Sequence, residues 1–383
     1  MGAPLDGVIV IALEQAVAAP LATRHLADLG ATVLKVERPG VGDFSRSYDT
    51  KMNGASTFFV WANRGKQSIE LDLKVPDDRT TFDALVAGAD VFVQNLSAAA
   101  GERAGIDAAH VHAMHPHLIA CEITGYGRGG PRTDDKAYDL AIQAEAGAIA
   151  LTGEADRMSK VGFSAADISA AMYALSSILA ALYRRSVTGE GAAISVSMLE
   201  CLTEWTAPAV YSAAHTGTVP DRAGHRHALI APYGLYGLGD GTSVLVAVQS
   251  NPEWASFAAV VLGDASLADD PRFVDNEDRI ANVAALEDEI EQVFATLDSA
   301  AAGRRLTDGR IAWSRVHDPI EVWNHEQLAA RGRKMRVDHP RGEATMLLPP
   351  FNISGVTAPS SRIPALGEHD TGLVEHLRRR ARP

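Results

Sequence analysis

Short apolar runs alternate with segments of helical spacing along the first third of the chain. Runs of strand length, rich in β-branched residues, occupy positions 8–13, 32–36, 67–73, 91–93 and 118–123. Between them, 18–29 and 77–87 carry apolar residues at helical spacing. This repetition of strand, helix and strand predicts βαβ units, and therefore an α/β fold with a doubly wound, mostly parallel, Rossmann-like sheet. A ligand is then expected at the carboxyl ends of the strands.

The rest of the chain predicts a second, smaller α/β domain. Residues 168–183 form an uncharged apolar helix pattern, which indicates burial in a core or in a subunit interface. A glycine-rich stretch at 217–241 is typical of a linker or an active-site loop, and further strand and helix patterns follow it. We therefore expect a large domain at 1–220 together with 326–383, and a small domain at 221–325.

Composition narrows the class of protein. Of the 383 residues, 46% are hydrophobic and 22% are charged, which is the balance of a folded globular protein. The net charge of −13 argues against nucleic acid as the main partner. Cys121 and Cys201 are the only cysteines, which excludes a disulfide framework and a four-thiolate metal site. No apolar run reaches the length of a membrane span, and residues 1–22 lack the basic start of a secretory signal. We expect a cytoplasmic protein without a membrane partner.

Asp167 stands at the expected start of the apolar helix, and two roles fit this position. As a helix cap, its carboxylate would accept backbone N–H groups. As a nucleophile, an ionised carboxylate can attack a thioester and form a covalent intermediate. The helix dipole and the free N–H groups would keep it ionised in either role. Position alone leaves both interpretations open.

Three other features suggest familiar sites, and their surroundings argue against each. Residues 125–130 match G-x-G-x-x-G, but Pro131 and a polar stretch follow where a dinucleotide site needs a helix, so a tight glycine loop is favoured. Four histidines at 110–117 lack carboxylates or cysteines at ligand spacing, so we expect a solvated surface segment and no metal site. Cys121 lies inside a predicted strand with no base beside it, which indicates a buried structural thiol.

Basic residues gather in the loops near the predicted strand ends, where a phosphorylated ligand is expected. They are Arg38, Lys74, Arg103 and Lys136. His225 and His227 lie in the glycine-rich stretch and are weaker candidates for contact with a ligand.

Ordered segments along nearly the whole chain form a specific set. Before residue 100 they are AAP at 18–20, LADLGA at 26–31, VLKVERPG at 33–40, IELDLK at 69–74 and VQN at 93–95. After it they are Arg103, TGYG at 124–127, KAYDLAIQ at 136–143, Asp167, VSM at 196–198 and PALGEH at 364–369. Together they resemble the family III CoA-transferases, the group of formyl-CoA transferase, carnitine CoA-transferase and α-methylacyl-CoA racemase.

The resemblance implies that Asp167 is the catalytic nucleophile and that coenzyme A enters as a substrate, with no tightly bound cofactor. The residues that match the family's CoA-lining positions are Val17, Ala18, Arg38, Leu71, Lys74, Asn95, Leu96, Arg103 and Lys136. Arg38 and Lys74 are expected at the adenosine phosphate end, and Lys136 nearer the acyl end. The family also implies a homodimer of two interlocked chains.

Two departures from branches of the family narrow the expected activity. The racemases carry a histidine before the position of Asp139, and Tyr138 stands there instead, which removes one member of an acid–base pair. Formyl-CoA transferase has a glycine run that closes over its site, whereas residues 230–234 are Ile-Ala-Pro-Tyr-Gly. The first departure favours a transferase over a racemase, and the second argues against formate or oxalate as substrates.

The implied function is transfer of CoA from an acyl-CoA donor, such as succinyl-CoA or another dicarboxyl-CoA, to a carboxylic acid. The intermediates would be an anhydride and a CoA thioester of Asp167, with backbone N–H groups at the helix start stabilising the oxyanions. Candidates for contact with the acids are Tyr138, His225 and His227, with Arg222 and Arg226 available for a second carboxylate. The alternatives are a 2-methylacyl-CoA racemase or isomerase and a non-catalytic CoA-binding protein.

Overall fold

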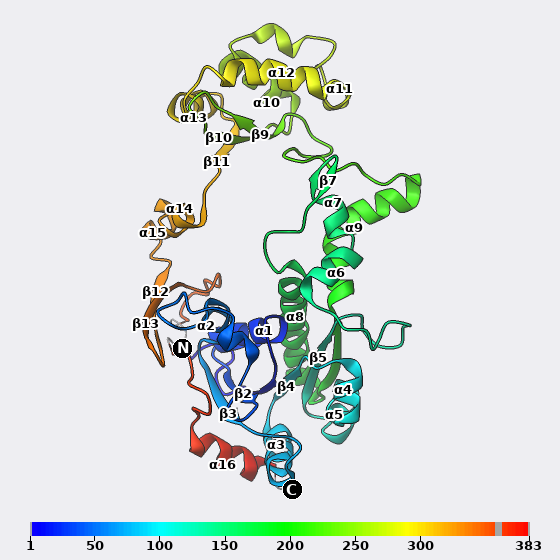
Figure 1. The fold of residues 1–383 in the computed structure, drawn as a ribbon, viewed down its shortest axis with the longest axis vertical. Coiled ribbons are helices and arrows are strands. Elements are labelled where there is room, and N and C mark those ends of the chain that lie inside the picture. Colours follow the sequence, from blue (N-terminus) through cyan, green and yellow to red (C-terminus); the bar gives the residue numbers. More distant parts are fainter. Residues whose placement is uncertain (1, 357–361, 382–383) are drawn as a thin grey trace. The chain divides into compact units, whose positions relative to one another are not determined.

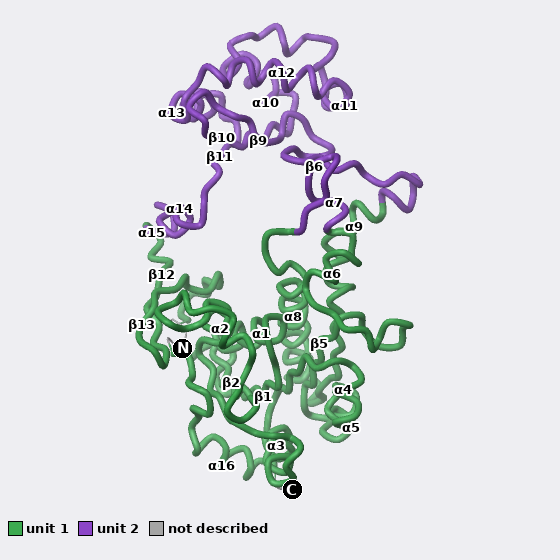
Figure 2. Tube along the Cα trace, viewed as in Figure 1, with its two compact units in different colours: residues 1–148, 161–211, 330–383 green, residues 149–160, 212–329 purple. Residues whose placement is uncertain are grey.

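The computed structural model describes residues 2–356 and 362–381, and the chain forms two compact units (Figures 1 and 2). The larger unit comprises Met1–Ala148, Val161–Tyr211 and Ala330–Pro383, and the smaller comprises Ile149–Lys160 and Ser212–Ala329. The sequence placed the boundaries at 220 and 325. It also assigned residues 149–160 to the large domain, whereas they pack with the smaller unit.

A six-stranded sheet forms the centre of the larger unit, in the order β3-β2-β1-β4-β5-β8. Its strands are β1 (Ile9–Leu13), β2 (Thr32–Glu37), β3 (Lys66–Glu70), β4 (Val91–Gln94), β5 (Ile119–Thr124) and β8 (Ala192–Ser197). Every neighbouring pair is parallel, which confirms the predicted sheet. The chain order reverses between β1 and β4, and the carboxyl ends of these two strands form the switch point at which such sheets bind ligands.

Helices cover both faces of this sheet. Val10 and Ala12 of β1 belong to one core with α1 (Ala18–Asp28) and α8 (Ala165–Thr188). Ile9 and Ile11 belong to the core on the other face, which is completed by α3 (Pro76–Gly88), α5 (Ala108–Met114) and α16 (Thr371–Arg380). Burial on both faces explains why these strands are continuous apolar runs in the sequence.

Helix α8 is the apolar helix expected from residues 168–183. Ala170, Ala171 and Ala174 are fully buried, and their small side chains let α8 pack closely on α1. By length and composition α8 could cross a membrane, but half of its most apolar stretch is buried inside the protein, which is typical of a core helix. Cys121 lies in the same core, and burial raises the pKa of its thiol, as expected for a structural cysteine.

The larger unit also contains shorter elements around the ends of the strands. These are η1 (Phe44–Ser47), α2 (Thr57–Asn63), α4 (Ala98–Arg103), α6 (Asp139–Glu145), α7 (Ala148–Leu151, whose end passes into the smaller unit), α9 (Met198–Thr216, likewise), β12 (Lys334–His339) and β13 (Gly342–Leu347). Helix α6 precedes α8 in the chain and contacts it, which places Asp139 and Asp167 in the same part of the unit.

The smaller unit has its own antiparallel sheet, β11-β10-β9, and its own core. Its strands are β9 (Tyr233–Gly237), β10 (Ser243–Ala247) and β11 (Ala312–Arg315), with a short hairpin of β6 (Gly153–Glu154) and β7 (Arg157–Met158). Its helices are α10 (Asn251–Ser256), η2 (Phe257–Leu262), η3 (Ala265–Ala268), α11 (Asn276–Ala281), α12 (Val283–Phe294), α13 (Ser299–Asp308), α14 (Pro319–Trp323) and α15 (Glu326–Ala330). Trp254, Phe257 and Phe294 are fully buried at its centre.

Candidate active site

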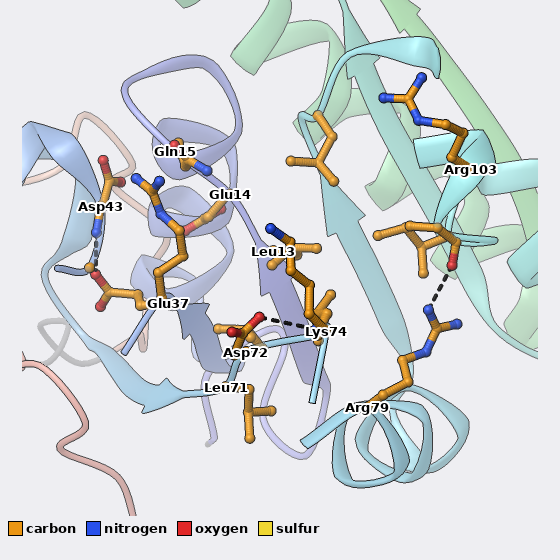
Figure 3. Close-up of a pocket in the computed structure, with 17 residues that line it drawn as sticks. Leu13, Glu14, Gln15, Glu37, Asp43, Leu71, Asp72, Lys74, Arg79 and Arg103 are labelled. Carbon is orange, nitrogen blue, oxygen red and sulfur yellow. Dashed lines mark hydrogen bonds between the residues drawn. The ribbon is translucent and has the colours of Figure 1, made fainter. Parts of the chain in front are cut away.

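A cavity of about 480 Å³ opens at the switch point of the large sheet (Figure 3). The segments that follow β1, β2, β3 and β4 all contribute to its lining. Five of the nine residues predicted to contact CoA lie in this lining: Arg38, Leu71, Lys74, Leu96 and Arg103. Residues far apart in the sequence meet here because the carboxyl ends of parallel strands share one edge of the sheet.

The cations around this cavity are not equivalent. Arg38, Lys74 and Arg103 are exposed, and in the part of the chain that the structure describes none of their side chains is paired with a carboxylate. Arg79 also lines the cavity, but its Nε donates to Asp83 Oδ1 at 2.8 Å and its Nη1 donates to the Ala104 carbonyl at 2.7 Å. Three unpaired cations in one cavity suit a ligand with several phosphates, although the whole chain is acidic.

Asn95 joins the ends of β1 and β4 across the switch point. Its Oδ1 accepts the Gln15 N–H at 2.9 Å, and its Nδ2 donates to the Gln15 carbonyl at 2.9 Å. The oxygen and the nitrogen of the amide are thereby both bonded to the Gln15 backbone, so Asn95 shapes the cavity through Gln15, which lines it. Val17 and Ala18 are buried at the start of α1 and contribute to the same turn. Lys136 lies elsewhere, exposed in the turn before α6.

Four buried charged side chains stabilise the turn between β1 and α1. Ala16 has a left-handed backbone with φ of 62°, and its N–H donates to Asp43 Oδ1 at 3.1 Å. Lys35 Nζ donates to Asp43 Oδ2 at 2.8 Å and contacts Glu14, whose Oε1 also accepts from Lys66 at 2.6 Å. Burial alone would raise the pKa of Asp43, but Lys35 and the backbone N–H groups keep it below its usual value. Asp43 is therefore held as an acceptor for Ala16.

The sequence interpretation missed this charge network. Its members are Glu14, Lys35, Asp43 and Lys66, and all four are buried. A signal for it was present, because Lys35 interrupts the otherwise apolar run 32–36, and a lysine inside a buried strand requires a carboxylate partner. The partners themselves come from other strands and loops.

Asp167 occupies the first turn of α8, but it is not the cap. Asp139 Oδ1 accepts the N–H of Ala166 at 2.8 Å and the N–H of Asp167 at 3.2 Å. The remaining early N–H groups, of Ala165 and Ile168, donate to the carbonyls of Phe163 and Ser164. The expected cap role of Asp167 is therefore wrong, and so is the expected use of these N–H groups for oxyanions, because all four are occupied.

The surroundings of Asp167 also reverse its expected charge state. Burial, and then the neighbouring Asp139 carboxylate, raise the pKa of Asp167 to about 7. The dipole of α8 therefore does not keep it ionised at acidic pH as the sequence suggested. Among the described residues its carboxylate has no hydrogen-bond partner, so it is available to react.

The charge of Asp167 acts on the pKa of one tyrosine. Burial, and then the charges of Asp43, Asp167 and Tyr138, raise the pKa of Tyr48. The side chain of Tyr138 is 73% exposed at the start of α6. Tyr48 was not singled out from the sequence.

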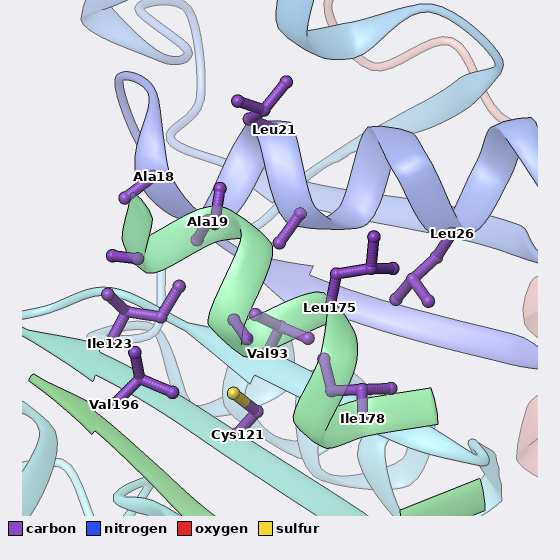
Figure 4. Close-up of a cluster of buried hydrophobic side chains, with 14 of the residues drawn as sticks. Ala18, Ala19, Leu21, Leu26, Val93, Cys121, Ile123, Leu175, Ile178 and Val196 are labelled. Carbon is purple, nitrogen blue, oxygen red and sulfur yellow. The ribbon is translucent and has the colours of Figure 1, made fainter. Parts of the chain in front are cut away.

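The start of α8 rests on a packed core. Helix α1 packs on α8 there through small side chains such as Ala18 and Ala19 (Figure 4).

The predicted acid-binding residues of the glycine-rich stretch lie in the smaller unit. Arg226 Nη1 donates to both oxygens of the Glu287 carboxylate, at 2.8 and 3.0 Å. Arg222 Nε donates to the Glu154 carbonyl at 2.8 Å. Neither arginine is therefore free for a second carboxylate, contrary to the expectation from the sequence. His227 stacks on Tyr233, and His225 lies 3.8 Å from Glu287. For these two histidines a role in substrate contact stays a prediction.

Known proteins share this chain's sequence and fold over nearly its whole length. The family model for CoA-transferase family III matches residues 5–370. An acetyl-CoA:oxalate CoA-transferase of Acetobacter aceti is 33% identical over 97% of this chain and 95% of that protein. A succinate–glutarate CoA-transferase of Agrobacterium fabrum is 32% identical over 98% and 96%. A succinyl-CoA:mesaconate CoA-transferase of Haloarcula hispanica is 33% identical over the same shares.

Solved structures give the same result for the fold. A CAIB/BAIF family protein from Brucella suis superposes with a TM-score of 0.85 at 32% identity, covering 98% of this chain and 100% of that one. Rv3272 from Mycobacterium tuberculosis superposes with a TM-score of 0.85 at 25% identity, covering 97% and 99%.

The Asn95–Gln15 pairing predicts a stability effect. Asn95→Asp removes the donor and places a carboxylate against the Gln15 carbonyl, so the free energy of unfolding should fall by about 1–3 kcal/mol in chemical denaturation. Asn324→Asp makes the same chemical change at an exposed position and should alter it by less than about 0.5 kcal/mol. Equal effects of the two substitutions would contradict the role given to Asn95.

The raised pKa of Asp167 predicts a pH-dependent effect on stability. In the unfolded chain this carboxyl loses its proton near pH 4, whereas in the folded state it keeps the proton to about pH 7, so ionising it costs stability as the pH rises between these values. Asp167→Asn should therefore stabilise the protein at pH 8, on the order of 1–2 kcal/mol after allowance for its partial exposure, and have little effect at pH 4.5. Exposed Asp134→Asn is the control, and a gain independent of pH would refute the shift.

Proposed function

Because the chain belongs to CoA-transferase family III, we propose that it moves coenzyme A from an acyl-CoA donor to a free carboxylic acid through covalent intermediates at Asp167. One observation carries this proposal: Asp167 is a half-buried carboxyl without a hydrogen-bond partner among the described residues, at a helix start capped by another residue. The relatives that bear CoA-transferase names support the reaction class.

The cavity at the switch point supports a binding site for the CoA nucleotide. Arg38, Lys74 and Arg103 supply unpaired positive charge, and Leu71 and Leu96 supply apolar surface. A guanidinium or ammonium group binds phosphate oxygens through charge-assisted hydrogen bonds. We assign the phosphates of CoA to the three cations, with the pantetheine chain running past Gln15 toward Asp167.

The reaction balances without a further reactant. The Asp167 carboxylate attacks the donor thioester, and the C–S bond breaks to give a mixed anhydride and CoA thiolate. The thiolate attacks the aspartyl carbonyl, which releases the donor acid and leaves an aspartyl-CoA thioester. The acceptor carboxylate then attacks this thioester, and the displaced thiolate takes the new acyl group, which restores Asp167. The overall reaction exchanges one thioester for another of similar free energy, so no nucleotide triphosphate is consumed.

The protein's share of this work is to orient the reactants and to exclude water. A pKa of about 7 leaves a large ionised fraction of Asp167 at neutral pH and makes the carboxylate more basic than a free aspartate. Since the N–H groups at the start of α8 are occupied, we assign stabilisation of the oxyanions to the phenol of Tyr48, whose pKa is raised in part by the charge of Asp167.

We further propose that the acids are small dicarboxylic acids and that the enzyme works in the cytoplasm as an interlocked homodimer. The names of the relatives support acids such as glutarate, mesaconate and oxalate. Oxalate therefore belongs in the test, although the missing glycine run argued against it.

The proposed dimer has support in an exposed apolar surface on α8 and α9. Tyr183, Val187 and Trp205 are exposed there, and a second chain would cover them.

The assignment of the phosphates can be tested with two ligands. Arg38→Ala and Lys74→Ala should each weaken CoA binding about tenfold in titration calorimetry, because each removes a charge-assisted bond. Dephospho-CoA lacks the 3′-phosphate, so the variant that contacts this group should bind it as tightly as the unchanged protein does. Arg79→Gln lines the same cavity, but its guanidinium is used by Asp83 and Ala104, so it should lose less than about threefold. Losses of equal size in all three variants would contradict the assignment.

The covalent mechanism can be tested by trapping. The enzyme is incubated with acetyl-CoA or succinyl-CoA and a panel of acids that includes oxalate, glutarate and mesaconate, and new acyl-CoA is detected by mass spectrometry. Hydroxylamine added during turnover should convert the thioester into a hydroxamate at Asp167, located by peptide mapping. Asp167→Ala should give no adduct and lower kcat by at least about 1,000-fold.

Two results would overturn the mechanism, the second of them from the same incubation repeated in deuterated solvent without an acid. Turnover without an adduct at Asp167 would exclude the covalent route. Exchange of the α-proton into deuterated solvent without any acceptor acid would identify the alternative, a 2-methylacyl-CoA racemase.

A further inference from the structure

The side chain of Asp139 connects α6 to the start of α8. Its Oδ1 accepts the N–H groups of Ala166 and Asp167, and its Oδ2 accepts from Gln143 Nε2 at 2.7 Å. Asp139 thus accepts three hydrogen bonds, and two come from the N–H groups that a helix-starting side chain normally caps. Ser164, which precedes the helix, makes no side-chain cap.

Gln143 extends this connection along the same face of α6. It is fully buried, its Oε1 accepts the Val161 N–H at 3.0 Å, and its Nε2 also donates to the Phe163 carbonyl at 3.2 Å. Asp139 and Gln143 are one helical turn apart, so a single face of α6 holds the segment from Val161 to Asp167 at several points. The position of Asp167 is therefore set by α6 as well as by its own helix.

This arrangement determines what the Asp167 carboxylate can do. An aspartate in the first turn of a helix is well placed to accept the nearby N–H groups itself, which would lower its reactivity. Asp139 already occupies the N–H groups of Ala166 and Asp167, and Ile168 donates to Ser164. The Asp167 carboxylate is left without these partners.

We propose that Asp139 is a positioning residue: it caps α8 in place of Asp167 and so keeps the Asp167 carboxylate free to attack the acyl-CoA. This inference rests on the proposed function. Gln143 has the supporting role of fixing the orientation of the Asp139 carboxylate.

Among the described residues, Asp139 is the one charged group that contributes to the raised pKa of Asp167. Helix α6 carries Asp139, and the residue after η1 is Tyr48, whose pKa is raised in part by the charge of Asp167. The first turn of α1, which packs on α8, is Ala18–Leu21 and carries no ionisable side chain. A change in the titration of Asp167 on substitution of Asp139 can therefore be assigned to these two carboxyls.

Two substitutions separate the charge of Asp139 from its capping role. Asp139→Asn keeps an acceptor oxygen and removes the charge, whereas Asp139→Ala removes both. The titration midpoint of Asp167 is followed by carbon-13 NMR of labelled carboxyls and assigned with Asp167→Asn. It should fall by about one unit in Asp139→Asn, and further in Asp139→Ala, where the Asp167 carboxylate can take over the vacant N–H groups.

Turnover should follow the same order. In Asp139→Ala, kcat should fall about 100-fold, because the nucleophile turns toward the helix, while KM for acyl-CoA stays within about twofold. Asp139→Asn should lose less than about tenfold and move the acid limb of kcat/KM to lower pH. Asp298→Ala is the control, since it removes a helix cap of the same kind in the smaller unit and should change none of these quantities.

The two proposals fail in different ways. If the midpoint of Asp167 stays within about 0.3 unit of its original value in both variants, the positioning role is refuted even when transfer is observed. If the midpoint moves as expected but no donor and acid support transfer, the geometry assigned to Asp139 stands and the proposed reaction fails. Loss of folding in Asp139→Ala would leave Asp139→Asn as the deciding variant.

Discussion

The turn between β1 and α1 is the constraint on which the rest of the site depends. It lies at the switch point of the sheet and contains Ala16, whose backbone is left-handed. Asn95 accepts the N–H of Gln15, and Asp43 accepts the N–H of Ala16. Placing four charges in a core costs several kcal/mol of desolvation per ion. The opposite charges outweigh this cost at Lys35, whose pKa is raised, and at Asp43, whose pKa is lowered, whereas burial dominates at Lys66 and lowers its pKa to about 7. Apolar residues of similar size would fill the same space without this desolvation cost. The charges therefore make sense as a means of holding one particular backbone geometry at the edge of the cavity.

The sequence predicted the sheet well and the supports of the site poorly, for physical reasons. Runs such as 91–93 and 118–123 become strands buried on both faces, so their composition alone identifies them. The predicted strand 67–73 ends at Glu70, and the chain then makes a turn in which the Val75 N–H donates to the Asp72 carbonyl before α3 begins at Pro76. The partners of Lys35 could not be predicted from local pattern, because they come from other loops.

The contrast between local pattern and distant partners also explains which site residues could be identified from the sequence. Arg38, Lys74 and Arg103 follow strands, and parallel topology brings strand ends together regardless of their distance along the chain. Asn95 was named through the family resemblance, and in the structure its amide oxygen and nitrogen both bond to the Gln15 backbone. The net charge of −13 gives no indication of where cations gather, and the cavity lining contains Arg38, Lys74 and Arg103 although carboxylates such as Asp72 line it too.

Asp139 and Asp167 illustrate how two carboxyls of the same chemical type acquire different tasks. Both lie at the first turn of a helix, where a carboxyl is usually an acceptor for free N–H groups. Only one can serve the start of α8, and Asp139 does so from 28 residues earlier in the chain. A nucleophile at a helix start would otherwise be stabilised as a cap and held in its ground state. Supplying the cap from another helix resolves this conflict, because the helix end is satisfied while the carboxyl beside it stays reactive.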